Sequence, residues 1–282
     1  MKVLVTGKHG QVARALADHT SDHPEIDVLF AARGDTPFPL DLEKPETIYT
    51  AIEDAKPDAI VSAAAYTAVD LAEDEEEVTF RINAEGPRHI GKAANTANIP
   101  VIHLSTDYVF DGTLDRPYVE EDDVAPLGVY GRSKLGGEQA LSLETPNHLI
   151  LRTAWVYSPY GKNFYKTMLR LAESRDELSV VDDQIGNPTS AHLISKGLFT
   201  ILERWRRGSA IGIGDVFHFA GPDEMTWCGF ARRIFTESAA SGGPTARVNP
   251  ITTADYPTKA ARPRNSRLNS TKFHQTFDFD PA

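Results

Sequence analysis

The sequence predicts an α/β protein with a doubly wound parallel sheet and a smaller C-terminal lobe. Short runs rich in Val, Ile and Leu alternate with amphipathic stretches as far as Glu173. Beyond that residue the alternation loses its regularity, and Gly- and Pro-rich loops appear around residues 240–250. We therefore expect residues 1–155 to form the sheet domain, with later segments returning to it. Residues 156–282 should form mainly the smaller lobe.

Composition limits the classes of function. A chain of 282 residues can bury a sizeable core, and its net charge of −11 argues against binding nucleic acid. Cys228 is the single cysteine, which excludes an intrachain disulfide and favours a reducing, cytoplasmic location. No apolar stretch approaches the roughly 18 residues that a membrane span needs, so no membrane partner is expected. The acidic runs 73–77 and 120–123 are typical of solvated faces rather than of metal sites.

The first predicted strand, residues 2–6, leads into a glycine turn and then a helix. The spacing Gly7-x-x-Gly10-x-x-Ala13 lets the backbone approach a pyrophosphate at a helix N-terminus, where free N–H groups favour anions. This pattern predicts a Rossmann-type domain for NAD or NADP.

The second predicted strand, residues 28–31, bears on which of the two cofactors binds. An acidic residue usually follows this strand and holds the ribose 2′-hydroxyl, but here the chain reaches Arg33. This favours NADPH while leaving NADH usable. The alternative is an exposed loop arginine with no ligand.

The following elements continue the alternation. We expect a helix over 45–55, a strand over 57–65 that opens into small residues, a helix over 78–97 and a strand over 101–106. Carboxyl ends of parallel strands share one edge, so Gly7, Ala65 and the triplet 105–107 should converge there. Thr106 would then lie near the ligand, although a threonine at a strand end commonly just satisfies nearby backbone.

Tyr130 and Lys134 are four residues apart at the head of the next predicted helix. One turn places both side chains on the same face. A phenol with a pKa near ~10 needs a nearby cation to favour the phenolate, and Lys134 is positioned to supply it. The pair therefore indicates a tunable acid, against the alternative of a solvated surface pair.

Residues 149–157 predict a strand that ends in aromatic residues, and residues 163–173 predict an amphipathic helix. Trp155 could stack on a sugar or base, or could simply belong to the core. No Cys/His spacing indicates zinc, and the nine histidines look unconnected.

Taken together, these segments resemble the extended short-chain dehydrogenases/reductases, and more closely the dTDP-4-dehydrorhamnose reductase family. The resemblance covers nearly the whole chain. The segments that carry it are Gly7-Lys8-His9-Gly10-Gln11-Val12, Thr67-Ala68-Val69-Asp70, Ser105-Thr106-Asp107-Tyr108-Val109-Phe110, Tyr130-Gly131-Arg132-Ser133-Lys134, Asp183-Gln184-Ile185-Gly186-Asn187-Pro188-Thr189 and, later, Tyr256-Pro257-Thr258 with Arg262-Pro263-Arg264-Asn265-Ser266-Arg267-Leu268.

The resemblance implies NADPH-dependent reduction of the C4 keto group of dTDP-4-dehydro-β-L-rhamnose, the final step of dTDP-L-rhamnose synthesis. Tyr130 would be the general acid, Lys134 would lower its pKa and hold the nicotinamide ribose, and Thr106 would bind the same oxygen. The implied cofactor-binding residues are Gly7, Gly10, Gln11, Val12, Arg33, Asp41, Leu42, Ala63, Ala65, Tyr66, Thr67, Tyr130 and Lys134. The implied substrate-binding residues are Val69, Asp70, Thr106, Asp107, Tyr130 and Trp155.

Two alternatives remain open at the level of sequence. One is a non-catalytic NAD(P)-binding protein like the regulatory subunit of methionine adenosyltransferase. The other is a nucleotide-sugar epimerase or another 4-ketoreductase. The segments 183–189 and 67–70 resemble the reductases better.

The resemblance fails where some family members form a magnesium-bridged dimer through acidic groups. This chain has Ala15 and His192 at two matching positions and ends at residues 278–282, before a matching C-terminal helix. Magnesium prefers oxygen ligands, so we expect no metal and either a monomer or a dimer that is not bridged by metal.

Overall fold

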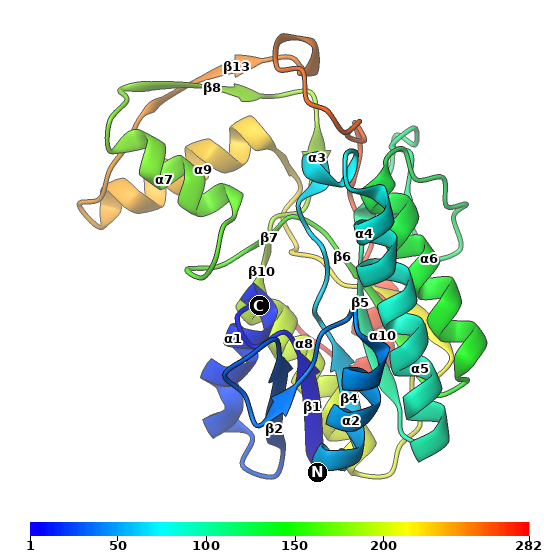
Figure 1. Cartoon of the computed structure of the whole chain (residues 1–282). Helices are drawn as coiled ribbons and strands as arrows, with labels where there is room; N and C mark the ends of the chain where they lie inside the picture. The colour runs from blue at the N-terminus through cyan, green and yellow to red at the C-terminus, as the bar shows by residue number, and fades with distance from the viewer. Residues whose placement is uncertain (282) are drawn as a thin grey trace.

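A parallel sheet of seven strands forms the centre of the molecule (Figure 1). The computed structural model describes residues 1–281. The strand order is β11-β6-β5-β4-β1-β2-β3, and every neighbouring pair is parallel, which confirms the predicted sheet. These strands are β1 (Lys2–Thr6), β2 (Asp27–Ala32), β3 (Phe38–Pro39), β4 (Ala59–Ser62), β5 (Val101–Thr106), β6 (His148–Thr153) and β11 (Asp215–His218).

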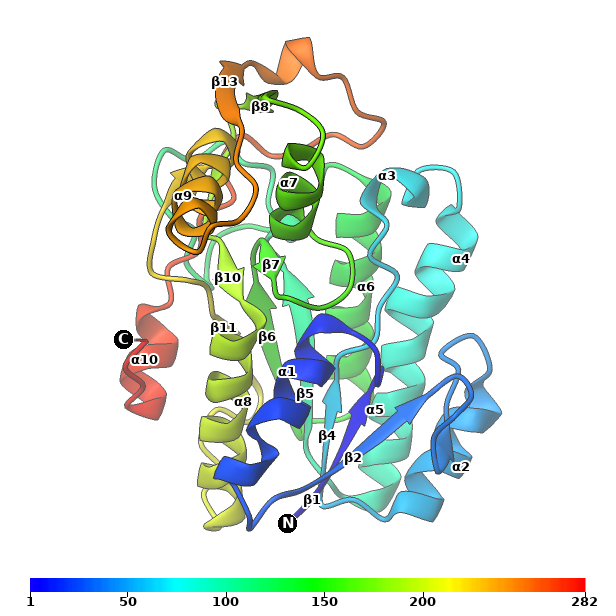
Figure 2. The same cartoon turned by 90° about the vertical axis from the view of Figure 1, so that its left-hand side faces the viewer.

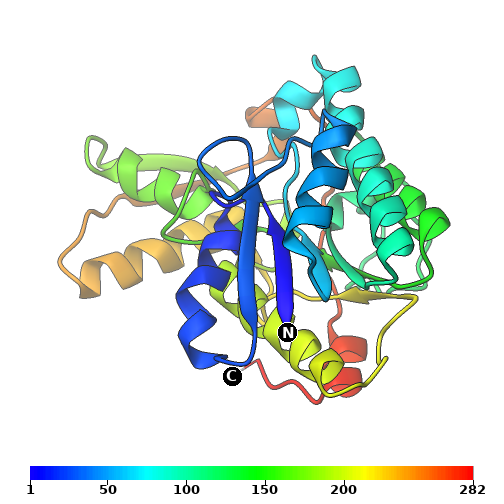
Figure 3. The same cartoon turned by 60° about the horizontal axis from the view of Figure 1, so that its bottom comes forward.

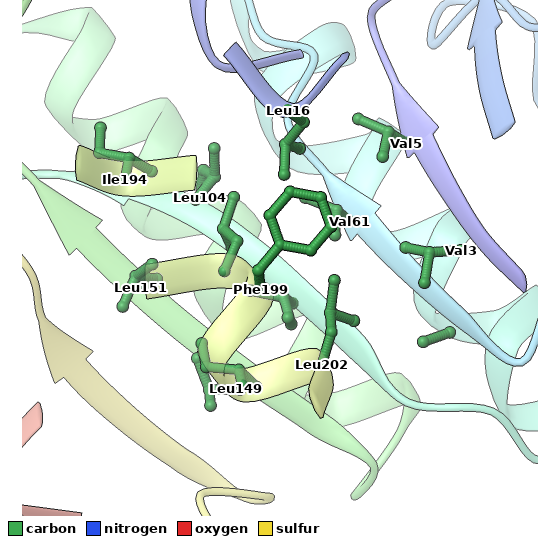
Figure 4. Packing of buried hydrophobic residues seen from close by; sticks show 14 of the residues in the cluster. Val3, Val5, Leu16, Val61, Leu104, Leu149, Leu151, Ile194, Phe199 and Leu202 are labelled. Atoms are coloured by element: carbon green, nitrogen blue, oxygen red, sulfur yellow. The ribbon is translucent and has the colours of Figure 1, made fainter. Parts of the chain in front are cut away.

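Helices cover both faces of this sheet (Figures 2 and 3). On one face lie α1 (Gln11–His19) and α8 (Ala191–Arg206); on the other lie α2 (Pro45–Ala55), α5 (Gly86–Ala97) and α6 (Val129–Glu144). The strand period of two divides the core accordingly, since Val3 and Val5 pack with α1 and α8 whereas Leu4 packs on the opposite side. Phe199 of α8 lies among these side chains in Figure 4.

The predicted helix over 78–97 is confirmed, with one irregularity. It is continuous through α4 (Glu76–Phe80), a π-helical turn η2 (Arg81–Glu85) and α5. Asn83, in the π-helical turn, accepts a hydrogen bond from the Tyr66 backbone N–H and donates to the Tyr66 carbonyl and to Ser133 Oγ. The turn therefore ties the loop after β4 to α6.

The prediction of one unbroken strand over 149–157 is wrong. β6 ends at Thr153, and Trp155 adopts a left-handed backbone conformation with φ 47°. A positive φ cannot continue an extended run. The chain therefore leaves the large sheet, and β7 (Val156–Tyr157) pairs instead with β10 (Thr189–Ser190).

A smaller lobe lies beyond the carboxyl ends of the strands, at the top of Figure 1. It has its own apolar cluster, which includes Met168, Leu178, Phe230 and Ile234. Its elements are α7 (Phe164–Ala172), β8 (Glu177–Val181) paired with β13 (Arg247–Ile251), β9 (Ile185–Gly186) paired with β12 (Met225–Thr226), and α9 (Trp227–Ala240).

Several late segments pack against the large sheet rather than in the small lobe. β11 extends the sheet, α8 covers one face, and α10 (Thr271–Phe277) buries Phe273 and Phe277 against the same core. The division at residue 155 stays a prediction, and we describe the two parts by their elements. The short helices are α3 (Val69–Ala72), η1 (Thr20–Asp22), η3 (Asp107–Val109) and η4 (Thr253–Asp255). Within residues 1–281, the structure contains no helix both long and apolar enough to cross a bilayer.

Candidate active site

A cleft of about 640 Å³ opens at the carboxyl ends of the central strands. Its walls come from the turn after β1, the loops after β2 and β4, the end of β5 and the start of α6. Every residue predicted to hold the cofactor lines it: Gly7, Gly10, Gln11, Val12, Arg33, Asp41, Leu42, Ala63, Ala65, Tyr66, Thr67, Tyr130 and Lys134. The structure thus gathers them in one place, while their individual roles remain proposals.

The glycine turn between β1 and α1 fits a pyrophosphate. Gly7 has φ +92°, and a Cβ at this residue would lie 3.2 Å from the Cβ of Ala64. A side chain here would strain the backbone and crowd the loop after β4. Helix α1 begins after Gly10 with no side-chain cap, so N–H groups of its first turn are available to an anion.

The end of the cleft beside β2 carries positive charge. Arg33 is exposed, lines the cleft and makes no hydrogen bond or ion pair through its side chain within residues 1–281. Lys8 lies nearby on the glycine turn and donates to the Asp35 carbonyl. Because Arg33 occupies the place where an acid would hold a ribose hydroxyl, this end suits a 2′-phosphate.

The start of α6 is held close to the end of β5. A Cβ at Gly131 would lie only 2.2 Å from the carbonyl oxygen of Tyr108, so only glycine allows this contact between the helix and η3. The Val129 N–H also donates to Glu73 Oε1 at 2.8 Å. Tyr130 is thereby placed beside Thr106, with its ring edge-on to Tyr108 at a centroid distance of 5.5 Å.

The environment of the Tyr130 phenol strongly favours its protonated form. Burial, reinforced by the charge of Asp107, raises its pKa to about 12, and a hydrogen bond with Thr106 opposes the shift. Lys134 is not among the groups that act on this pKa here, so its expected lowering of the phenol pKa stays a prediction. The Lys134 ammonium is directed to the sheet instead, where Nζ donates to the Leu104 carbonyl at 2.7 Å. At neutral pH the phenol is therefore a proton donor.

Lys134 is itself perturbed. Its side chain is buried on the floor of the cleft, and burial lowers its pKa to about 8, while Glu138 one turn later raises it. Besides the Leu104 carbonyl, Nζ lies 3.3 Å from His103 Nε2. Lys134 thus lies at the floor of the cleft, and its ammonium group interacts with two acceptors on β5.

Thr106 and Asp107 form a buried polar pair at the end of β5. Thr106 Oγ1 donates to Asp107 Oδ1 at 2.9 Å and accepts from the Tyr108 N–H, so it also caps η3. Burial raises the pKa of Asp107 to about 7 against the hydrogen bond from Thr106. Among the described residues, the buried Asp107 Oδ2 has no hydrogen-bond partner.

The other predicted substrate residues are engaged with the protein. Trp155 stacks on Trp227 with a centroid separation of 3.4 Å and an interplanar angle of 4°, and its Nε1 donates to Ser266 Oγ at 3.0 Å. One ring face is therefore already covered. Asp70, in α3 with Val69, pairs with Arg262 at 2.7 Å. Of the predicted substrate residues, Tyr130 lines the cofactor cleft, whereas Val69, Asp70, Thr106, Asp107 and Trp155 lie outside its lining.

The sequence did not indicate several residues that position this site. Among them are His103 beneath Lys134, Trp227 and Ser266 around Trp155, and Arg262 opposite Asp70. A second buried set joins α6 to the sheet, since Glu138 pairs with Arg152 at 2.7 Å and accepts from Ser105. Each is a contact between distant segments, for which one sequence carries no local signal.

Three features define the class of protein as an NAD(P)-dependent oxidoreductase of the short-chain type. They are the cleft, the uncapped helix N-terminus beside Gly7 and the protonated phenol of Tyr130 near Lys134. The comparisons with known proteins then identify the family. The family model described as "RmlD substrate binding domain" matches residues 1–282. The chain belongs to the dTDP-4-dehydrorhamnose reductase family.

Individual relatives agree with this assignment. A dTDP-4-dehydrorhamnose reductase of Sinorhizobium fredii is 48% identical over 277 residues, covering 98% of this chain and 92% of the relative. A crystal structure of such a reductase from Clostridium acetobutylicum superposes with a TM-score of 0.87 at 33% identity, covering 98% of this chain and 92% of that one. The Bacillus anthracis reductase, solved in complex with NADP, gives 0.86 at 31% identity, with 97% and 92% covered.

Proposed function

We propose that this chain reduces the C4 keto group of dTDP-4-dehydro-β-L-rhamnose to give dTDP-L-rhamnose, with NADPH as the preferred and NADH as a usable cofactor. One observation carries the proposal. The protonated phenol of Tyr130 lies beside Thr106 at the inner end of the cleft lined by the glycine turn. A carbonyl placed there meets a proton donor and a second hydroxyl. The NADP complex of the Bacillus anthracis relative supports the choice of cofactor.

When bound, the cofactor supplies a hydride to the carbonyl carbon. Tyr130 donates its phenolic proton to the oxygen as negative charge develops there, and the C4 hydroxyl results. Thr106 hydrogen-bonds the same oxygen and stabilises that charge. The Lys134 ammonium stabilises the phenolate left on Tyr130 and binds the nicotinamide ribose. The Arg33 guanidinium binds the 2′-phosphate.

The substrate would meet the opposite wall. Asp107 would accept a hydrogen bond from a sugar hydroxyl through its unpartnered oxygen. Trp155 would contact the sugar nucleotide with the face that Trp227 leaves uncovered. Val69 and Asp70 would border the site through α3, where Asp70 and Arg262 tie the C-terminal segment to the sheet domain.

The direct test is steady-state NADPH consumption with enzymatically prepared dTDP-4-keto-6-deoxy-L-sugar. We expect turnover that depends on both compounds. A protein that binds NADPH with unchanged affinity but never oxidises it would be a binding protein of the regulatory type. Tightly held NAD with no net oxidation would instead identify an epimerase.

We also propose a monomer, or a dimer that is not bridged by metal. Ala15 is buried and offers no ligand, and His192 lies 3.8 Å from Asp18 and stacks on His19. Within residues 1–281, no three His, Cys, Asp or Glu side chains gather as a metal site. Light scattering and activity should be unchanged by EDTA; dissociation on chelation would refute the proposal. The cytoplasmic location stays a prediction.

A further inference from the structure

A buried row of polar groups runs under the cleft from β4 through β5 to α6. His103 is in the middle of β5 and has no exposed surface. Its Nδ1 lies 3.0 Å from Ser62 Oγ on β4, and its Nε2 lies 3.3 Å from Lys134 Nζ on α6. The proposed reaction uses the charge of Lys134, but it gives no reason for a histidine beneath it.

The chemistry of the three groups fixes the state of the imidazole. An ammonium can only donate, so the Nε2 that faces Lys134 must carry its lone pair. The proton is then on Nδ1, from which it is donated to Ser62 Oγ. Burial lowers the pKa of His103 well below its usual value, and the charges of Lys134 and His148 act in the same direction. The ring is therefore neutral.

We propose that His103 is a positioning residue for the reaction, acting as the neutral acceptor that keeps Lys134 charged and aimed at the cofactor. The inference rests on the proposed function for its consequence in turnover, but the hydrogen bond itself does not. Two acceptors on β5, the His103 ring and the Leu104 carbonyl, take two of the three N–H groups of Lys134. The third remains for the cofactor ribose.

The other charged groups around this pair do not replace His103. Within residues 1–281, Glu138 is the one acid that acts on Lys134, and two nitrogens of Arg152 already hydrogen-bond its carboxylate at 2.7 to 3.2 Å. His148, on β6, is directed to the Thr145 carbonyl and to Ser142. Removing the acceptor at position 103 would leave a buried ammonium with the Leu104 carbonyl as its single direct partner among the described residues.

The test compares His103→Leu with His103→Gln. Leucine fills the volume without an acceptor, whereas the Gln amide oxygen can take the place of Nε2. The readout is the pKa of Lys134, followed through its 13Cε resonance in lysine-labelled protein and identified by its absence from Lys134→Met. We expect the Leu variant to lower this pKa by about 1 unit or more, and the Gln variant to stay within about half a unit of wild type.

The cofactor provides a second readout that needs no sugar. Fluorescence titration with NADPH at pH 8 should show roughly tenfold weaker binding by His103→Leu, recovering at pH 6 where Lys134 is charged again. A merely structural role would weaken binding equally at both pH values, and this result would overturn the inference. So would an unchanged Lys134 pKa in a folded Leu variant. Neither measurement uses the keto sugar, so absence of turnover would defeat only the proposed function.

Discussion

The residues proposed to bind the cofactor and those proposed to bind the substrate form two walls, the cofactor wall and the substrate wall, which are built in different ways. On the cofactor wall, groups such as Gly7, Ala65 and Lys134 are positioned by the ends of adjacent parallel strands and by the helix that follows. On the substrate wall, Trp155 and Asp70 are positioned by side chains more than seventy residues away in the sequence, such as Trp227 and Arg262. Regular structure organises the first wall, and long-range contacts organise the second. Substitutions should therefore affect cofactor and sugar separately.

The largest effect is expected at the border of the two walls. Tyr130→Phe removes the proton donor but keeps the ring, so kcat should fall by ~10²–10⁴-fold while the Kd for NADPH changes little. Tyr108→Phe is the matched control, because it deletes the neighbouring phenol, and its kcat should stay within about threefold. Stopped-flow reduction and fluorescence titration measure the two quantities. Wild-type turnover by Tyr130→Phe would remove it from the mechanism.

This contrast explains how much could be predicted from the sequence. Strand and helix periodicity placed the sheet, the glycine turn and Tyr130 with Lys134, since each depends on neighbours in sequence. The periodicity does not predict the break after Thr153, where Trp155 has a left-handed backbone and contacts Trp227 and Ser266 from distant segments. The sequence pattern indicates no partner for His103, although its ring contacts both Ser62 and Lys134. One sequence cannot reveal which distant groups meet.

Asp107 offers a pH-dependent test of the substrate wall. Its pKa is raised from 3.8 to about 7, so the folded protein keeps the proton that the unfolded chain loses as pH rises above 3.8. The free energy of unfolding should therefore fall between pH 4 and 7. Above pH 7 it should stay at the lower value, because Asp107 is then ionised in both the folded and the unfolded state. Asp107→Asn should stabilise the protein by about 4 kcal/mol at pH 8 and not at pH 4. Urea unfolding at both values checks this, and an equal effect at pH 4 would exclude the carboxylate as the cause.

Trp227 tests whether the substrate wall is independent of the cofactor wall. Trp227→Leu removes the ring stacked on Trp155, so the Trp155 face proposed to contact the sugar should lose its fixed orientation. We expect KM for the sugar nucleotide to rise about tenfold, with an unchanged Kd for NADPH. Equal weakening of both ligands would show that the two walls are not separable.

The smallest effect is expected at the exposed end of the cofactor wall. Arg33→Ala removes an exposed charge, so the ratio of kcat/KM for NADPH to that for NADH should fall about fivefold. Arg33→Lys should keep most of the preference, because it retains the charge. An unchanged ratio in Arg33→Ala would mean that Arg33 does not reach the 2′-phosphate.

The most direct test of the central claim is to follow the hydride itself. Wild-type protein would be incubated with NADPH deuterated at the transferable position and with dTDP-4-keto-6-deoxy-L-sugar, and the product examined by NMR and mass spectrometry. We predict one deuterium at C4 of the sugar, with one NADP⁺ formed for each product molecule. Product without deuterium at C4, or cofactor that returns to its starting oxidation state, would contradict reduction at the site that Tyr130, Thr106 and Lys134 define.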